Sequence, residues 1–294
     1  MGEIVGAGFL AHVPTIVLPD DVRRELNHGR ESTLYSGLHE LRREVFDVLK
    51  PDLVIVFDSH WFTTVEFVIT SADRRLGYFT SEELPRGMSS VPYDVKGDPT
   101  FAKLVGELAD ATPDCWITPI DNEHLPIMYA TTNFFPFLQG DEAWISVSTC
   151  QTAEPRDFAL VGSLIAQAIE QSDRRVVLIA SGALSHTFHT LRTLRDHEAA
   201  GEEHIFSEEA RRADHGVIDS WLEGDHARVI DNFAEFAKVK PEGRFAHYQM
   251  MVAALGGRSC IAPGRLFSKY ENSIGTGQVH VWFDRPASGW TGAS

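Results

Sequence analysis

The sequence predicts an α/β fold, a single domain with a mostly parallel central sheet that is flanked by helices and carries its active site at the carboxyl ends of the strands. Short runs of consecutive apolar residues, such as 53–57 and 176–180, are typical of strands buried on both faces. Segments with helical apolar periodicity separate these runs. Each run also breaks abruptly into small or polar residues that include a histidine, and ligands bind at such strand ends in open α/β sheets.

Composition narrows the class of protein. The chain has 294 residues, a net charge of -16 and no linker or low-complexity segment, so we expect one large domain over residues 1–285 and a tail over 286–294. The acidic balance argues against nonspecific binding to nucleic acid or to an anionic membrane. No apolar window reaches the roughly 18 residues of a membrane span, and the first residues do not resemble a signal peptide. Three dispersed cysteines fit a reducing cytoplasm, which is the expected location.

The first half of the chain predicts a βαβ unit. Residues 5–10 form a weak strand that ends at His12, and the apolar residues of 32–49 recur at spacings of three and four, as in an amphipathic helix. Residues 53–57 form the next strand, which breaks at Asp58 and leads to His60. Strands joined in this way are parallel, so His12 and His60 are expected at the same edge of the sheet.

The remaining elements follow from the same patterns. We predict strands at 65–70, 144–148, 176–180 and 278–283, helices at 99–110, 158–168 and 247–255, and a long loop at 72–98. The strand at 176–180 breaks into small residues that end at His186. Residues 198–238 are polar and helical, and solvated surface positions are expected for the four histidines of this region, which are His197, His204, His215 and His226.

Four histidines near strand ends or polar breaks suggest a metal site, a proton-transfer site, or both: His12, His60, His124 and His186. Two histidines and one carboxylate would leave coordination positions free for substrate. The carboxylate candidates are Asp58, Asp121, Glu123 and Glu242, and spacing alone does not choose among them. The GxSxG, P-loop, GxGxxG and HExxH motifs do not occur.

Four short motifs carry a family resemblance: AHVP at 11–14, DSHW at 58–61, SGALSH at 181–186 and GTGQV at 275–279. In this order and spacing they resemble the class III extradiol ring-cleaving dioxygenases, the superfamily of the protocatechuate 4,5-dioxygenase catalytic subunit. Within it they resemble in particular the bacterial homoprotocatechuate (3,4-dihydroxyphenylacetate) 2,3-dioxygenases. The resemblance extends from the first predicted strand to the last.

The resemblance implies a non-haem Fe(II), with Mn(II) as an alternative, held by His12, His60 and Glu242. It implies that His186 moves protons during catalysis and that His124 contacts substrate or oxygen. The implied reaction cleaves the ring of a catechol with O2 to a hydroxymuconic semialdehyde. The implied partners are these two small molecules, and a homo-oligomer is expected.

The sequence does not decide which substituent the substrate ring carries or which residue would bind it. A carboxylate on the ring substituent, as in 3,4-dihydroxyphenylacetate, needs a local cation or backbone donors in a chain this acidic. Arg244 is two residues from Glu242 and is the first candidate, with His247 and Arg86 as alternatives. Another catechol or an aminophenol, a Zn- or Mn-dependent hydrolase on the same site, and a non-catalytic binding protein are the competing hypotheses.

Overall fold

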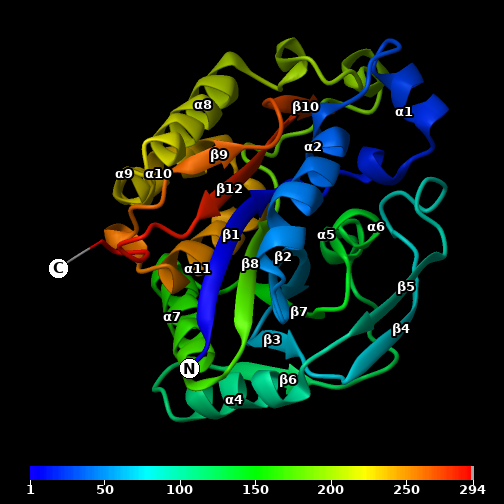
Figure 1. The fold of residues 1–294 in the computed structure, drawn as a ribbon. Helices are drawn as coiled ribbons and strands as arrows, with labels where there is room; N and C mark the ends of the chain where they lie inside the picture. The colour runs from blue at the N-terminus through cyan, green and yellow to red at the C-terminus, as the bar shows by residue number, and fades with distance from the viewer. Residues whose placement is uncertain (293–294) are drawn as a thin grey trace.

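A computed structural model of the chain describes residues 1–292 and contains an eight-stranded sheet with the order β6-β3-β7-β2-β8-β1-β12-β9 (Figure 1). The four central strands are parallel: β1 (Glu3–Leu10), β2 (Leu53–Thr63), β7 (Ala143–Cys150) and β8 (Arg175–Ser181). The outer strands make the sheet mixed, because β12 (His280–Asp284) and β9 (Gly264–Leu266) are antiparallel to their neighbours. At the other edge, β3 (Phe67–Thr70) pairs antiparallel with β7 and parallel with β6 (Ile117–Ile120). The predicted α/β class is confirmed.

Helices cover both faces of this sheet, and the strand side chains alternate between two cores. Phe9, Ile55 and Phe57 face the core that contains α4 (Pro99–Asp110), α7 (Pro155–Gln171), α8 (Glu208–Leu222) and α11 (Ala246–Ala254). Leu10 and Val56 face the core that contains α2 (Thr33–Leu41), α5 (Tyr129–Thr132) and α6 (Phe135–Leu138). Burial on both faces explains why the central strands are uninterrupted apolar runs.

The βαβ prediction is confirmed in direction and corrected in adjacency. β1 and β2 both pair parallel with β8, so they run the same way, but β8 lies between them. The connection is not one long helix over 32–49. After η1 (Pro14–Val17) and α1 (Asp20–Leu26), α2 continues into a single π-helical turn, η2 (Arg42–Phe46), and the short α3 (Asp47–Leu49).

The prediction of a long loop at 72–98 is wrong, because this segment is mostly a hairpin. It contains an antiparallel hairpin of β4 (Arg74–Phe79) and β5 (Val91–Lys96), and only residues 80–90 form its loop. Gly77 and Pro92 masked the strand signal. The alternation that reveals the hairpin is the burial of Phe79, Tyr93 and Val95 on one face, which packs on the α2 side of the sheet.

The polar region at 198–238 is helical in pieces: η3 (Leu194–His197), η4 (Glu202–His204), α8, α9 (His226–Asp231), α10 (Phe233–Phe236) and η5 (Ala237–Val239). The surface prediction fails for His226, which is fully buried. Its Nε2 donates to the carbonyl of Ala262 at 2.9 Å, and its Nδ1 lies 2.9 Å from the Tyr248 hydroxyl. Those two partners satisfy the ring, and sequence periodicity does not reveal them.

The last elements close the fold around the sheet edge. They are η6 (Glu242–Phe245), η7 (Gly257–Ser259), β10 (Glu271–Ser273) and β11 (Thr276–Gln278). In the predicted tail, Trp290 packs on the core and its indole N–H donates to the carbonyl of Ile4 at 3.1 Å, whereas the final two tail residues, 293 and 294, lie outside the described residues. Within residues 1–292, no helix has the length and apolar character needed to cross a membrane.

Candidate metal centre

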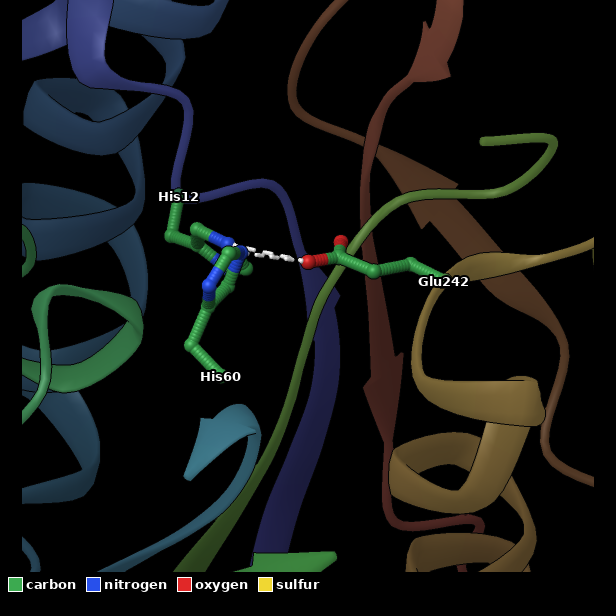
Figure 2. A group of neighbouring side chains, drawn as sticks. All are labelled: His12, His60 and Glu242. Atoms are coloured by element: carbon green, nitrogen blue, oxygen red, sulfur yellow. Dashed lines mark ion pairs between the residues drawn. The ribbon is translucent and has the colours of Figure 1, made fainter. Parts of the chain in front are cut away.

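Three side chains from distant segments meet beyond the carboxyl ends of the central strands (Figure 2). His12 follows β1, His60 lies in β2, and Glu242 opens η6. Glu242 Oε1 is 2.8 Å from His60 Nε2 and 3.4 Å from His12 Nε2. One ligand atom from each residue lies within 4.8 Å of the other two.

The backbone around Glu242 turns sharply to deliver its carboxylate. Gly243, Arg244 and Phe245 all have left-handed φ values, of 54°, 58° and 59°. At Gly243 a side chain would also meet Ser59, since an added Cβ would lie 3.1 Å from the Ser59 Cβ. A glycine is therefore suited to this position both by conformation and by space.

The segment after β8 fixes Glu242 from the other side. The Ala183 N–H donates to Glu242 Oε2 at 2.5 Å, and the Glu242 N–H donates to the Leu184 carbonyl at 3.1 Å. An isolated antiparallel bridge joins Ser185 to Pro241. Because β8 also lies between β1 and β2, this segment places all three side chains relative to one another.

The tautomer of His12 follows from its hydrogen bonds. Its Nδ1 is 2.9 Å from the Ser181 hydroxyl, and that hydroxyl donates its single proton to the Ala130 carbonyl at 2.6 Å. The hydroxyl must then accept from Nδ1–H, which leaves the Nε2 lone pair of His12 free to bind a metal.

His60 is held differently. Asp58 Oδ1 accepts the backbone N–H groups of His60 and Trp61, both at 2.9 Å, while Asp58 Oδ2 accepts the Thr131 hydroxyl at 2.8 Å. Asp58 is thus occupied by turn contacts and is not a ligand. The Tyr129 hydroxyl lies 2.7 Å from His60 Nε2 and donates to Glu83 Oε2 at 3.1 Å. In this arrangement His60 Nε2 carries a proton that a bound metal would displace.

The charges of the site favour a carboxylate surrounded by imidazoles. Burial opposes ionisation of Glu242, yet the neighbouring His12 and His186 hold the pKa of this carboxyl well below its usual value. Burial lowers the pKa of His186, so its imidazole is neutral near pH 7. Burial also opposes charge on His60, but Glu242 leaves the pKa of His60 raised.

The donor set fits a divalent metal ion. Glu242 Oε1 is buried and makes no hydrogen bond of acceptable geometry within the described residues, although imidazole nitrogens surround it. A cation shared with His12 and His60 would satisfy this oxygen. Two histidines and one carboxylate form the ligand set typical of non-haem Fe(II) sites that keep positions open for substrate.

A cavity of about 280 Å³ opens onto these residues. That volume is at the low end for ligand sites and suits a substrate with one ring. Its lining comprises His12, Val13, Pro14, His60, Glu83, Leu84, Tyr129, His186, Phe188, Leu194, Glu242, Ser273, Ile274, Thr276 and Gln278.

Comparison with known proteins identifies the family. The family model described as the catalytic LigB subunit of aromatic ring-opening dioxygenase matches residues 6–284. The chain belongs to this family. It is 29% identical over 263 residues to the 3,4-dihydroxyphenylacetate 2,3-dioxygenase of Escherichia coli, which covers 87% of this chain and 91% of that protein. The crystal structure of an uncharacterized protein from Escherichia coli K12 matches with a TM-score of 0.61 at 15% identity, over 95% of this chain and 99% of that one, and it supports the fold alone.

The family assignment confirms the resemblance found in the sequence and makes the chain an enzyme of a ring-opening dioxygenase family. Among the predicted site residues, His12, His60 and Glu242 come together as one possible metal site, and His186 lines the same cavity. His186 Nε2 is 3.9 Å from Glu242 Oε1. These four residues thus share one site in a LigB-family fold.

The other predicted residues lie away from the cavity. The side chain of His124 is 86% exposed on a turn between β6 and α5. Arg244 donates to the carbonyls of Gln151 and Ala153 at 2.6 and 2.7 Å. His247 is fully buried behind Gly182, where an added Cβ would be 2.5 Å from its Nε2. Arg86 is exposed in the loop at 80–90, near the rim residues Glu83 and Leu84 but not among the lining residues.

Sequence patterns did not single out Tyr129, Glu83 or Phe188, although all three line the cavity. Tyr129 follows His124 by five residues and, unlike His124, reaches the metal site. Its burial, with the nearby charges of Glu242 and Glu83, raises the pKa of the phenol, so the hydroxyl keeps its proton. The signal that was available was the aromatic residue in an apolar run directly after the polar cluster.

Proposed function

We propose that this LigB-family protein is an Fe(II)-dependent extradiol dioxygenase that opens the ring of a catechol with O2 and yields a hydroxymuconic semialdehyde. The observation that carries the proposal is the convergence of His12, His60 and Glu242 at a small cavity that His186 also lines. Mn(II) is the alternative metal for the same ligand set.

His12 and His60 through Nε2, and Glu242 through Oε1, would hold the metal. When bound, Fe(II) supplies Lewis acidity toward the catechol oxygens and electrons for the reaction with O2. Ser181 fixes the His12 tautomer, and the Ala183 N–H orients the Glu242 carboxylate. Both contacts prearrange the ligands and so reduce the reorganisation that binding requires.

His186 is the proton-transfer group in this proposal. Its neutral imidazole accepts a proton from a catechol hydroxyl at Nε2 and returns it as the ring opens. Phe188 lies beside it, with ring centroids 4.7 Å apart, and together with Leu194 it adds apolar surface to the cavity lining. His124, which is predicted to contact substrate or oxygen, would need to move inward from its exposed turn to do so.

The substrate in the name of the Escherichia coli relative, 3,4-dihydroxyphenylacetate, is the first catechol to test. Within residues 1–292 the cavity lining contains no lysine or arginine. A substrate carboxylate would therefore rely on neutral donors such as Ser273, Thr276 and Gln278. Arg244 and His247, the predicted anchors, make other contacts.

The test is oxygen uptake by protein reconstituted anaerobically with Fe(II) and then mixed with a panel of catechols and aminophenols. We expect uptake together with a yellow ring-opened product, and loss of activity in air that Fe(II) and reductant reverse. Activity with Zn(II) on ester or amide substrates and none with O2 would instead indicate a hydrolase. Catechol binding with no turnover under any metal would indicate a binding protein. The expected homo-oligomer is a separate prediction that light scattering checks.

A further inference from the structure

Glu83 is the one carboxylate of the cavity, within the described residues, that does not belong to the metal site. It makes no ion pair with a lysine, arginine or histidine of residues 1–292, and the hydroxyl of Tyr129 is the group that donates to its side chain. A bound metal would neutralise Glu242, but no lysine or arginine of the lining would neutralise Glu83. The cavity therefore presents a negative charge to whatever substituent the catechol ring carries.

The loop at 80–90 holds Glu83 in place. The buried Ser81 hydroxyl accepts the backbone N–H groups of Glu83 and Leu84 at 3.2 and 3.0 Å. The Ser81 N–H donates to the Met88 carbonyl at 2.9 Å, and the Met88 side chain is buried in the core on the α2 side. The turn that carries Glu83 is thus tied to the core at both ends.

The position of Glu83 relative to the metal site follows from Tyr129. The Tyr129 hydroxyl is 2.7 Å from His60 Nε2 and 3.1 Å from Glu83 Oε2, so only one hydroxyl separates this carboxylate from a metal ligand. A catechol that binds the metal through its two oxygens extends its ring away from the ligands into the cavity. The ring and its substituent would then occupy the cavity that Glu83 lines.

We propose that Glu83 makes this site select catechols whose ring substituent carries an ammonium group and disfavour those whose substituent carries a carboxylate. The inference rests on the proposed catechol dioxygenase function and refines its substrate class. An ammonium group would pair with the Glu83 carboxylate, whereas a carboxylate would meet a like charge at the exposed side of the cavity. The net charge of -16 acts in the same direction at longer range.

Glu83 has a second possible role, because it could simply position Tyr129 as a hydrogen-bond acceptor. Glu83→Gln separates the two roles, since the amide retains an acceptor oxygen and removes the charge. A positioning role alone would change turnover of all catechols by the same factor. A charge-reading role changes the ratio between substrates.

The experiment compares the Fe(II)-loaded wild type with Glu83→Gln and with the control Glu82→Gln. Both carboxylates are exposed, but only Glu83 lines the cavity. The substrates are dopamine, ethylcatechol and 3,4-dihydroxyphenylacetate, which carry a cationic, a neutral and an anionic substituent. kcat/KM is measured by oxygen uptake, and Kd is measured by anaerobic calorimetry without turnover.

We expect the wild type to prefer dopamine over 3,4-dihydroxyphenylacetate by at least about 10-fold in kcat/KM and in Kd. Glu83→Gln should reduce this ratio by about 10-fold, because solvent at this exposed carboxylate screens both the attraction and the repulsion, and change ethylcatechol by less than about 3-fold. Glu82→Gln should preserve the ratio. A wild type that prefers the carboxylate, or a ratio that Glu83→Gln leaves unchanged, overturns the inference.

The two proposals fail in different ways. If no catechol supports oxygen uptake, the proposed dioxygenase function fails, and the order of the calorimetric Kd values then decides the inference about Glu83. If the catechols bind with no preference by charge, or none binds, the inference about Glu83 is wrong whatever the turnover shows.

Discussion

The hydroxyl of Ser181 should increase the metal affinity of the site through His12, although Ser181 itself is not one of the metal ligands. It accepts from His12 Nδ1 at 2.9 Å and donates to the Ala130 carbonyl at 2.6 Å, both inside the protein. Ser181→Ala removes this relay with little change of volume. His12 can then flip, which moves Nε2 away from the metal position, or change tautomer, which places the proton on Nε2. Either event removes the lone pair that would bind the metal.

The expected loss can be estimated from comparable contacts. Removal of the group that orients a metal-bound histidine typically costs 10–100-fold in metal affinity, which corresponds to about 1.4–2.7 kcal/mol. The variant also leaves a buried imidazole N–H and a buried carbonyl without their partner, so its free energy of unfolding should fall by about 1–3 kcal/mol. Competition of the apo protein with a chelating dye for Mn(II) or Fe(II) measures the first quantity, and urea unfolding of the apo protein measures the second.

Ser59→Ala is the matched control. Ser59 is buried directly before His60, and its hydroxyl has no hydrogen-bond partner within the described residues. Its removal should therefore leave metal affinity within about 3-fold of the wild type and should not lower stability. Equal losses of metal affinity in the two variants, or an unchanged metal affinity in Ser181→Ala, would refute the proposal that Ser181 orients His12.

Three further outcomes follow from the site and its surroundings. His186→Gln should retain iron and catechol binding while kcat falls by about 100-fold, because the variant loses the proton acceptor, and an unchanged pre-steady-state rate of ring opening would contradict this role. Arg244→Met should cost about 1–2 kcal/mol of stability in urea unfolding through its lost contacts with the carbonyls of Gln151 and Ala153, and should leave the ratio of kcat/KM between charged and neutral catechols unchanged. Burial lowers the pKa of His280 to about 4 from the usual 6.5, so the unfolded chain binds the extra proton first, and this contribution to stability is complete above pH 6.5 and is lost as the pH falls toward 4. It amounts to at most about 3 kcal/mol; His280→Gln should flatten the decline in apo-protein unfolding over that pH range, whereas the exposed His28→Asn should not.

The sequence predicted the sheet well because two-sided burial leaves a direct mark on composition. It also predicted the edge at which His12 and His60 would meet, since parallel strands end on the same side. It could not identify the acid. Asp58 is nearest in sequence to His60, but its oxygens are taken by backbone N–H groups and by Thr131. Glu242 was implied by family resemblance alone.

The predictions that failed concern residues whose contacts are made with distant parts of the chain. His226 looks like a surface histidine because its neighbours are charged, and its partners Tyr248 and Ala262 lie 22 and 36 residues away. Arg244 is near Glu242 in sequence, but the left-handed turn at 243–245 sends its side chain toward Gln151 and away from the cavity. Proximity in sequence does not fix direction where φ is positive.

The six residues SGALSH at 181–186 connect these observations, because most of them make a contact that the site needs. Ser181 orients His12, and Gly182 leaves room for the ring of His247, which an added Cβ would meet at 2.5 Å. The Ala183 N–H and the Leu184 carbonyl hold Glu242.

Ser185 completes this segment through a buried acid. Its N–H and hydroxyl both donate to Asp214, at 2.9 and 2.6 Å, and Asp214 also accepts from the Tyr270 hydroxyl. Burial raises the pKa of Asp214 to about 6, because it disfavours the ionised carboxylate. The three hydrogen bonds act in the opposite direction and stabilise the ionised form. These contacts fix the backbone of Ser185 and therefore the position of the next residue, His186. A small-residue turn after β8 is therefore the element that makes one site from the ends of β1 and β2 and from η6, segments that are otherwise far apart in the chain.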